Sequence, residues 1–355
     1  MSSTDVVFVG SLPDDLARYQ VSIVRSDGTV IATALAIRRM NPGVIPTPLV
    51  STSRTRVYYM DGGSLVKSLR PDGKTSTVTT VPSQSQVQST FAVSPDDRRI
   101  AVSTIDYSQS PPLVRLYVED LNGSNHVEIF SSSSLYVWPV GWHAGNLVLA
   151  VGDAYAVTQP HTEAAHPWCE PSFGACVADN PYAAVHGYHL VDPANGNRIA
   201  ALGSDRCQVI GLLTAAGTIC REGEFPGGVV QQVPYCQPTF TACMRLADWH
   251  GIISDWIQIA TIWIGAMTPD GSRIATCCNF DSIEVYPKPP VGLAVTRGKV
   301  GAPQGWFDND YLMFQTIQID PRVQTSSTTI RSVGTGSEAA VSVQGVPVAL
   351  LPGGF

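Results

Sequence analysis

The chain has 355 residues, enough for two ordinary domains or one large repeat fold, and its formal net charge is −7. Its 22 lysines and arginines form no basic cluster beyond two Arg-Arg pairs, so we expect no nucleic-acid partner. No uninterrupted apolar run reaches the roughly 18 residues that a membrane-spanning helix needs, so we expect no insertion into a membrane.

The N-terminal part predicts strands over Val6–Val9, Tyr19–Arg25 and Thr29–Leu35, with a tight turn at Ser26-Asp27-Gly28 between the last two. Asp-Gly and Asn-Gly pairs favour such turns because both residues tolerate positive φ. Three later segments carry the same signal between alternating strand formers, namely Pro71–Gly73, Leu121–Ser124 and Pro193–Gly196. Helical periodicity is nearly absent, which predicts an all-β protein.

A second kind of turn recurs along the chain within the same local sequence pattern. Residues Ser94–Val102 read Ser-Pro-Asp-Asp-Arg-Arg-Ile-Ala-Val, and Thr268–Thr276 read Thr-Pro-Asp-Gly-Ser-Arg-Ile-Ala-Thr. Weaker copies occur near Ser53, Trp142, Thr214 and Trp306. Spacings of roughly 40 to 70 residues suit the blades of a β-propeller with loop insertions, since one blade takes about 40–50 residues. These turns would join the first strand of a blade to its second.

Six such turns follow three N-terminal strands that lack an innermost strand of their own. The C-terminal segment Val346–Leu351 is apolar enough to supply that strand and to close the ring, which would remove exposed sheet edges. We therefore predict one propeller domain over residues 1–355 with seven blades. Six blades is the alternative, if the C-terminal segment is an outer strand.

The two strong repeats, together with the Gly-Trp turns at Gly141 and Gly305, resemble the TolB-type (WD40-like) β-propellers. The resemblance covers the whole chain by repeat. It implies a periplasmic or secreted scaffold of a kind that binds proteins, peptides or glycans. A shared fold does not assign a function.

Eight cysteines lie between residues 169 and 278, and four of them belong to twin segments. Trp168–Cys176 and Tyr235–Cys243 share the pattern aromatic, Cys, Glu or Gln, Pro, Ser or Thr, Phe, any residue, Ala, Cys. Six residues between the cysteines suit a disulfide-closed loop better than zinc, whose cysteines are usually two to four residues apart. We therefore predict Cys169–Cys176 and Cys236–Cys243 bridges.

The connectivity of the other four cysteines is left open; they are Cys207, Cys220, Cys277 and Cys278. Disulfides favour an oxidising compartment. The N-terminus lacks the layout of a signal peptide, so either the protein stays in the cytoplasm or a leader has been removed; the cysteines favour the second alternative. We expect an extracytoplasmic protein, secreted or periplasmic, whose leader is absent from this sequence.

The twin segments fall in insertions at about 156–183 and 222–243, each between the second and third strands of neighbouring blades. Long insertions in a compact fold are usually functional, and aromatic side chains on ordered loops are common contact residues. The candidate ligand contacts are Trp168, Tyr235, His161, His166, Arg245 and Trp249. For Trp168 and Tyr235 the alternative is packing within their own loop. Trp138, Trp142, Trp263 and Trp306 lie on or beside innermost strands and are expected to pack between blades.

No nucleophile elbow, metalloprotease helix, phosphate-binding loop or dinucleotide fingerprint occurs, and we expect no cofactor and no bound metal. The first hypothesis is a non-catalytic binding propeller that holds a protein, peptide or glycan on the face carrying the cysteine loops. The second is a secreted glycan hydrolase or lyase with paired carboxylates at the channel mouth. The third is a sensor ectodomain of a membrane protein.

Overall fold

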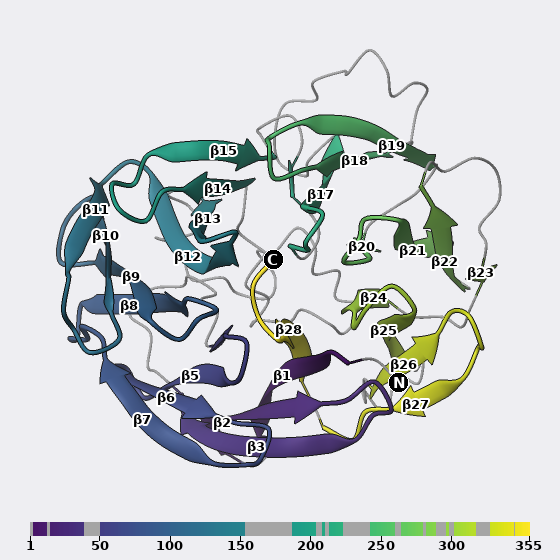
Figure 1. The fold of residues 1–355 in the computed structure, drawn as a ribbon, viewed down its shortest axis with the longest axis horizontal. Coiled ribbons are helices and arrows are strands. Elements are labelled where there is room, and N and C mark those ends of the chain that lie inside the picture. Colours follow the sequence, from purple (N-terminus) through teal and green to yellow (C-terminus); the bar gives the residue numbers. More distant parts are fainter. Residues whose placement is uncertain are drawn as a thin grey trace.

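The computed structural model shows seven four-stranded antiparallel sheets arranged in a ring (Figure 1). It describes residues 3–12, 15–38, 50–152, 187–203, 208–209, 213–222, 242–259, 264–279, 282–288, 296–297, 302–316, 327–343 and 345–355. These residues are all strands, turns and connections, and none of them forms a helix long and apolar enough to cross a membrane. The prediction of an all-β, seven-bladed propeller is confirmed, and the six-bladed alternative is wrong.

Blade one joins the two ends of the chain. Its innermost strand is β28 (Val346–Leu351), followed outward by β1 (Asp5–Leu12), β2 (Asp15–Val24) and β3 (Val30–Ile37). Strands β28 and β1 are antiparallel, with Val6 opposite Leu350. The C-terminal segment therefore closes the ring as its sequence predicts.

Each of the other six blades takes four consecutive strands. Blade two contains β4 (Val50–Thr52), β5 (Val57–Asp61), β6 (Leu65–Leu69) and β7 (Thr75–Thr80), and blade three contains β8 (Val87–Val93), β9 (Arg99–Asp106), β10 (Leu113–Asp120) and β11 (Val127–Ser132). Blade four contains β12 (Tyr136–His143), β13 (Asn146–Gly152), β14 (Gly187–Val191) and β15 (Arg198–Leu202). Blade five contains β16 (Gln208–Val209), β17 (Thr218–Glu222), β18 (Ala242–Ala247) and β19 (Ile253–Ile259). Blade six contains β20 (Ile264–Met267), β21 (Arg273–Asn279), β22 (Ser282–Pro287) and β23 (Thr296–Arg297), and blade seven contains β24 (Ala302–Trp306), β25 (Tyr311–Thr316), β26 (Ser327–Ser332) and β27 (Glu338–Ala340).

The repeated first-to-second-strand turn is held by one set of hydrogen bonds. In blade three, Ser94 Oγ donates to Asp96 Oδ1 over 2.6 Å and accepts from the Arg99 amide over 2.9 Å. In blade six, Thr268 Oγ1 donates to Asp270 Oδ1 over 2.8 Å and accepts from the Arg273 amide over 3.0 Å. A hydroxyl followed two residues later by an aspartate is thus the chemical requirement that the repeat preserves.

The core lies between neighbouring sheets, where tryptophan side chains donate hydrogen bonds from one blade to the preceding blade. Trp142 Nε1 donates to the Ala92 carbonyl of the preceding blade over 3.4 Å. Trp306 Nε1 makes the equivalent bond to Ala266 over 2.9 Å. A β-bulge precedes each tryptophan within a Pro-x-Gly-Trp segment, and bulges re-aim side chains in this way. Trp138 is also fully buried, as its predicted packing role requires, whereas Trp263 lies outside the described residues.

Candidate binding site

The ring has two faces that differ in what they carry. The turns that join first to second and third to fourth strands emerge on one side, here called the turn face. The connections between second and third strands emerge on the other, here called the insertion face. In blade four the chain leaves β13 at Gly152 and returns at Gly187, and in blade five it leaves β17 at Glu222 and returns at Ala242. The two longest connections between strands therefore start from the same face of adjacent blades.

Most of the predicted contact residues belong to these connections. Trp168, Tyr235, His161 and His166 lie outside the described residues, as do Cys169, Cys176, Cys207 and Cys236. The backbones of Cys243, Cys277 and Cys278 lie in strands β18 and β21. The two predicted loop bridges therefore stay predictions.

Blade five contains two of the predicted residues in mid-strand positions. Arg245 on β18 is half-buried and lies opposite Cys220 of β17 in the antiparallel register. Cys220 has no exposed surface and is disulfide-bonded. Its partner is outside the side chains that the structure describes. A bridge at this position fixes the strand next to the β17–β18 connection.

The end of the chain lies across the turn face near the axis of the ring (Figure 1). After β28 the Gly353 amide donates to the Ser53 carbonyl of blade two over 2.7 Å. The Phe355 amide donates to the Trp142 carbonyl of blade four over 3.1 Å. A Cβ at Gly353 would lie 2.3 Å from the Thr52 carbonyl oxygen, so only glycine permits this close approach. Residues 352–355, here called the tail, thus connect the inner ends of blades one, two and four.

Phe355, the last residue of the tail, packs against the stacked rings of His143 and Trp249. His143 and Trp249 are stacked with ring centroids 4.0 Å apart and planes inclined by 6°, and the Phe355 ring lies 5.7 Å from that of Trp249. His143 Nδ1 donates to the Phe355 oxygen over 2.8 Å, and Trp249 Nε1 donates to the Thr214 carbonyl over 3.0 Å. Burial lowers the pKa of His143, which favours its neutral form.

The place of Trp249 differs from that of the other predicted contacts. It belongs to the turn between β18 and β19, so it lies at the turn face and is 7% exposed. Trp249 therefore packs against the tail and does not face the insertions. The sequence offers no signal for this stack, because its three rings come from positions 143, 249 and 355.

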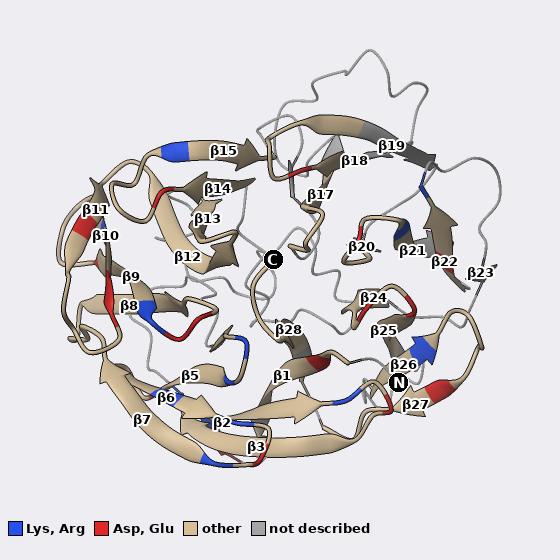
Figure 2. Ribbon diagram, in the orientation of Figure 1, with Lys and Arg blue, Asp and Glu red and all other residues tan. Residues whose placement is uncertain are grey.

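The electrostatic character of the described surface is mixed. The described Lys and Arg positions and the described Asp and Glu positions are interspersed around the blades (Figure 2). Among the described residues no group of three or more His, Cys, Asp or Glu side chains is placed to hold a metal ion. The described part of the site therefore consists of hydrogen-bonding backbone, aromatic rings and strand ends that position the two insertions.

Comparisons with known proteins agree with the architecture. No family model and no curated protein matches the chain. Among solved structures, it is similar to an oligogalacturonate lyase in complex with manganese, with a TM-score of 0.52 and 11% identity over 88% of this chain and 87% of that one. It is also similar to the acylaminoacyl peptidase of Pyrococcus horikoshii, with a TM-score of 0.51 and 8% identity over 97% of this chain and 51% of that one. TolB from Acinetobacter baumannii is found as well, with a TM-score of 0.40 and 10% identity over 99% of this chain and 66% of that one.

At such low identities a structural likeness establishes the fold alone. The class of protein is a seven-bladed β-propeller closed by its terminal strands.

Proposed function

We propose that this protein is an extracytoplasmic, non-catalytic propeller that binds a protein, peptide or glycan on its insertion face. The ligand contacts would come from Trp168 and Tyr235, with His161, His166 and Arg245 as polar partners. Cys169–Cys176 and Cys236–Cys243 bridges would hold the two loops in shape. Preorganised loops lose less conformational entropy on binding, which is the physical value of such bridges.

The observation that carries this proposal is that the two faces of the ring carry different structures. The tail and the stack of His143, Trp249 and Phe355 occupy the turn face near the axis. The two longest connections leave the opposite face from adjacent blades. A ligand that lies over the channel therefore has the insertion face as its accessible approach. The disulfide at Cys220 supports an oxidising compartment.

Glycan and peptide arrays, probed with the labelled protein, test the proposal. A ligand found in this way should bind at least about tenfold more weakly to Trp168→Ala or Tyr235→Ala, since anchoring aromatics commonly contribute 2 kcal/mol or more. The melting temperature of both variants should match that of the parent. His250→Ala is the matched control, because this side chain is 85% exposed on the turn face of blade five.

Two results would contradict the proposal. The first is equal binding by the parent and by both aromatic variants. The second is release of shortened or unsaturated products from a bound glycan, which would establish the enzyme instead. Peptide mapping without reduction tests the loops separately, and free thiols at 169, 176, 236 and 243 would remove the rigid-loop part of the argument.

A further inference from the structure

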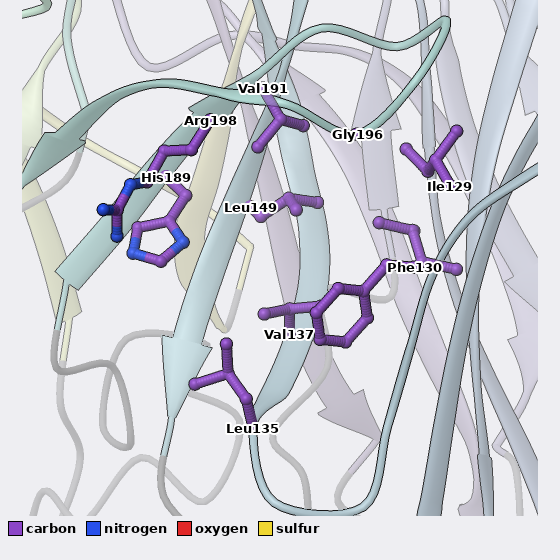
Figure 3. Close-up of a pocket in the computed structure, with 10 residues that line it drawn as sticks. Ile129, Phe130, Leu135, Val137, Leu149, His189, Val191, Gly196 and Arg198 are labelled. Atoms are coloured by element: carbon purple, nitrogen blue, oxygen red, sulfur yellow. The ribbon is translucent and has the colours of Figure 1, made fainter.

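A cavity of about 290 Å³ lies between blades three and four (Figure 3). Its lining includes residues of the outermost strands β11 and β15, so it lies away from the axis of the ring. Its floor consists of buried side chains from both blades, Leu116 of β10, Leu149 of β13 and Val191 of β14. Ile129 and Phe130 of β11 form part of the wall and are half-buried.

A β-bulge shapes the apolar wall of this cavity. Leu116 lies opposite Phe130, but the next residue of β10, Tyr117, lies opposite Glu128, so Ile129 is the extra residue of the ladder. Strict alternation would send Ile129 and Phe130 to opposite faces of the sheet. The bulge lets both line the cavity, and bulges are frequent beside binding sites for this reason.

A second bulge brings a positive charge to the other wall. In β14 and β15, Leu190 lies opposite Ala200, but Val191 lies opposite Arg198, so Ile199 is skipped. Ile199 is consequently 55% exposed and does not line the cavity, whereas Arg198 does. A regular ladder would have placed an isoleucine opposite Val191. The strand irregularity thus replaces an apolar lining residue with a guanidinium group.

The polar end of the cavity consists of Arg198 and His189, whose side chains lie next to each other in Figure 3. Arg198 has no carboxylate partner among the described residues. Burial is the main cause that lowers the pKa of His189, and the charge of Arg198 adds to it, so the imidazole is neutral near pH 7. A neutral imidazole keeps one N–H donor, and the guanidinium offers a planar set of donors that fits a carboxylate.

We propose that this cavity binds an amphipathic carboxylate, with the apolar part between Phe130 and Leu149 and the carboxylate on Arg198 and His189. The cavity volume of about 290 Å³ is many times the roughly 10–15 Å³ that one water molecule needs, so the cavity can admit the chain of a small carboxylate. A cationic ligand would meet an uncompensated guanidinium. Arg198 is exposed, so water solvates its charge when no ligand is bound, and a neutral ligand would gain no charge-assisted hydrogen bond there.

Octanoate is the probe, and its binding to the full chain is measured by isothermal titration calorimetry at pH 7.5. Octanol and octylammonium are the matched neutral and cationic probes, and we expect each to bind at least about tenfold more weakly, because hydrogen bonds to a charged group are the strong ones. Across butanoate, hexanoate and octanoate the affinity should rise about fourfold per methylene, as burial of each CH₂ requires.

Two variants locate the binding site. Arg198→Gln should weaken octanoate binding at least about tenfold. Arg115→Gln, the same change on an exposed position of β10, should leave it unchanged. Equal binding by Arg198→Gln, no dependence on chain length, or no heat with octanoate at either of two temperatures about 15 °C apart would each overturn the proposal. None of these results depends on Trp168 or Tyr235, so the two proposals fail separately.

Discussion

The hydroxyl of Tyr58 donates a 2.8 Å hydrogen bond to Asp97 Oδ1, which joins strand β5 of blade two to the first turn of blade three. Asp97 has a φ of 62°, in the left-handed region, and the corresponding residue of the second repeat is Gly271 with a φ of 69°. Thr55 Oγ1 also donates to Asp97, over 3.0 Å. Asp97 therefore occupies a backbone position that suits glycine, while its carboxylate links two blades.

Asp97→Gly should destabilise the protein although it relieves the backbone. The loss of the acceptor leaves the buried Tyr58 hydroxyl unpaired, which costs about 1–3 kcal/mol and exceeds the smaller gain from a relaxed φ. Tyr58→Phe in the same chain removes the unpaired group, so the double variant should be about 1–2 kcal/mol more stable than the sum of the single changes predicts. Guanidinium unfolding of all four proteins measures this coupling, and strict additivity would show that the contact contributes nothing.

Gly196 and Gly123 separate the cost of a left-handed backbone from the cost of a steric clash. Both lie in third-to-fourth-strand turns with positive φ, of 73° and 82°. A Cβ on Gly196 would lie 2.2 Å from the Ile129 carbonyl oxygen, whereas nothing lies within 4 Å of one on Gly123. We expect Gly123→Ala to cost about 1 kcal/mol and Gly196→Ala about 2–4 kcal/mol. If thermal unfolding shows the same loss of stability for both variants, blades three and four are not in close contact at this turn.

Phe355→Ala should loosen the tail more than the ring. Aromatic pairs contribute about 0.5–1.5 kcal/mol beyond the area that they bury, and here the removed ring packs on Trp249. The amides of Gly353 and Phe355 report on the tail directly through their bonds to Ser53 and Trp142. Their hydrogen exchange should become about tenfold faster, while amides of the inner strands keep their protection. Unchanged exchange at both amides would rule out a role for the stack in holding the tail.

Acid should destabilise the protein through His143 and His189. Burial lowers the pKa of both side chains below the value of 6.5 that applies to the unfolded chain. The unfolded state therefore binds more protons as the pH falls below 6.5, and the stability present above that pH is lost as it falls through the lowered pKa values. The double variant His143→Gln/His189→Gln should flatten the decline of the melting temperature between pH 7.5 and 5. The exposed His126→Gln serves as the control, and an identical decline in all three proteins would contradict the assignment.

The sequence predicts the architecture because each blade repeats local chemistry. The hydroxyl-x-aspartate turns at Ser94 and Thr268 and the Asp-Gly or Asn-Gly turns at Gly28 and Gly123 are set by neighbours within a few residues. Counting the turns shows that the N-terminal strands lack an inner strand. The pairing of β28 with β1 could therefore be predicted from the need to close the ring.

The stack and the cavity could not be predicted in this way. The environment of Trp249 depends on rings from other blades, and its sequence neighbours suggest only that it follows an insertion. Arg198 reaches the cavity because of a register shift of one residue, and alternation alone would have placed Ile199 there. Features that depend on register or on contacts between distant blades have no local signature.

The pairing of Val6 with Leu350 imposes an order on folding during synthesis. Strands β1, β2 and β3 are synthesised before blades two to seven, but the strand that covers the inner edge of β1 is synthesised after them. Until then β1 presents unpaired amides and carbonyls, which are a template for aberrant pairing with another chain. Blades two to seven consist of consecutive strands and have no such delay. The same pairing that closes the ring therefore makes the completion of blade one depend on a strand that follows blades two to seven.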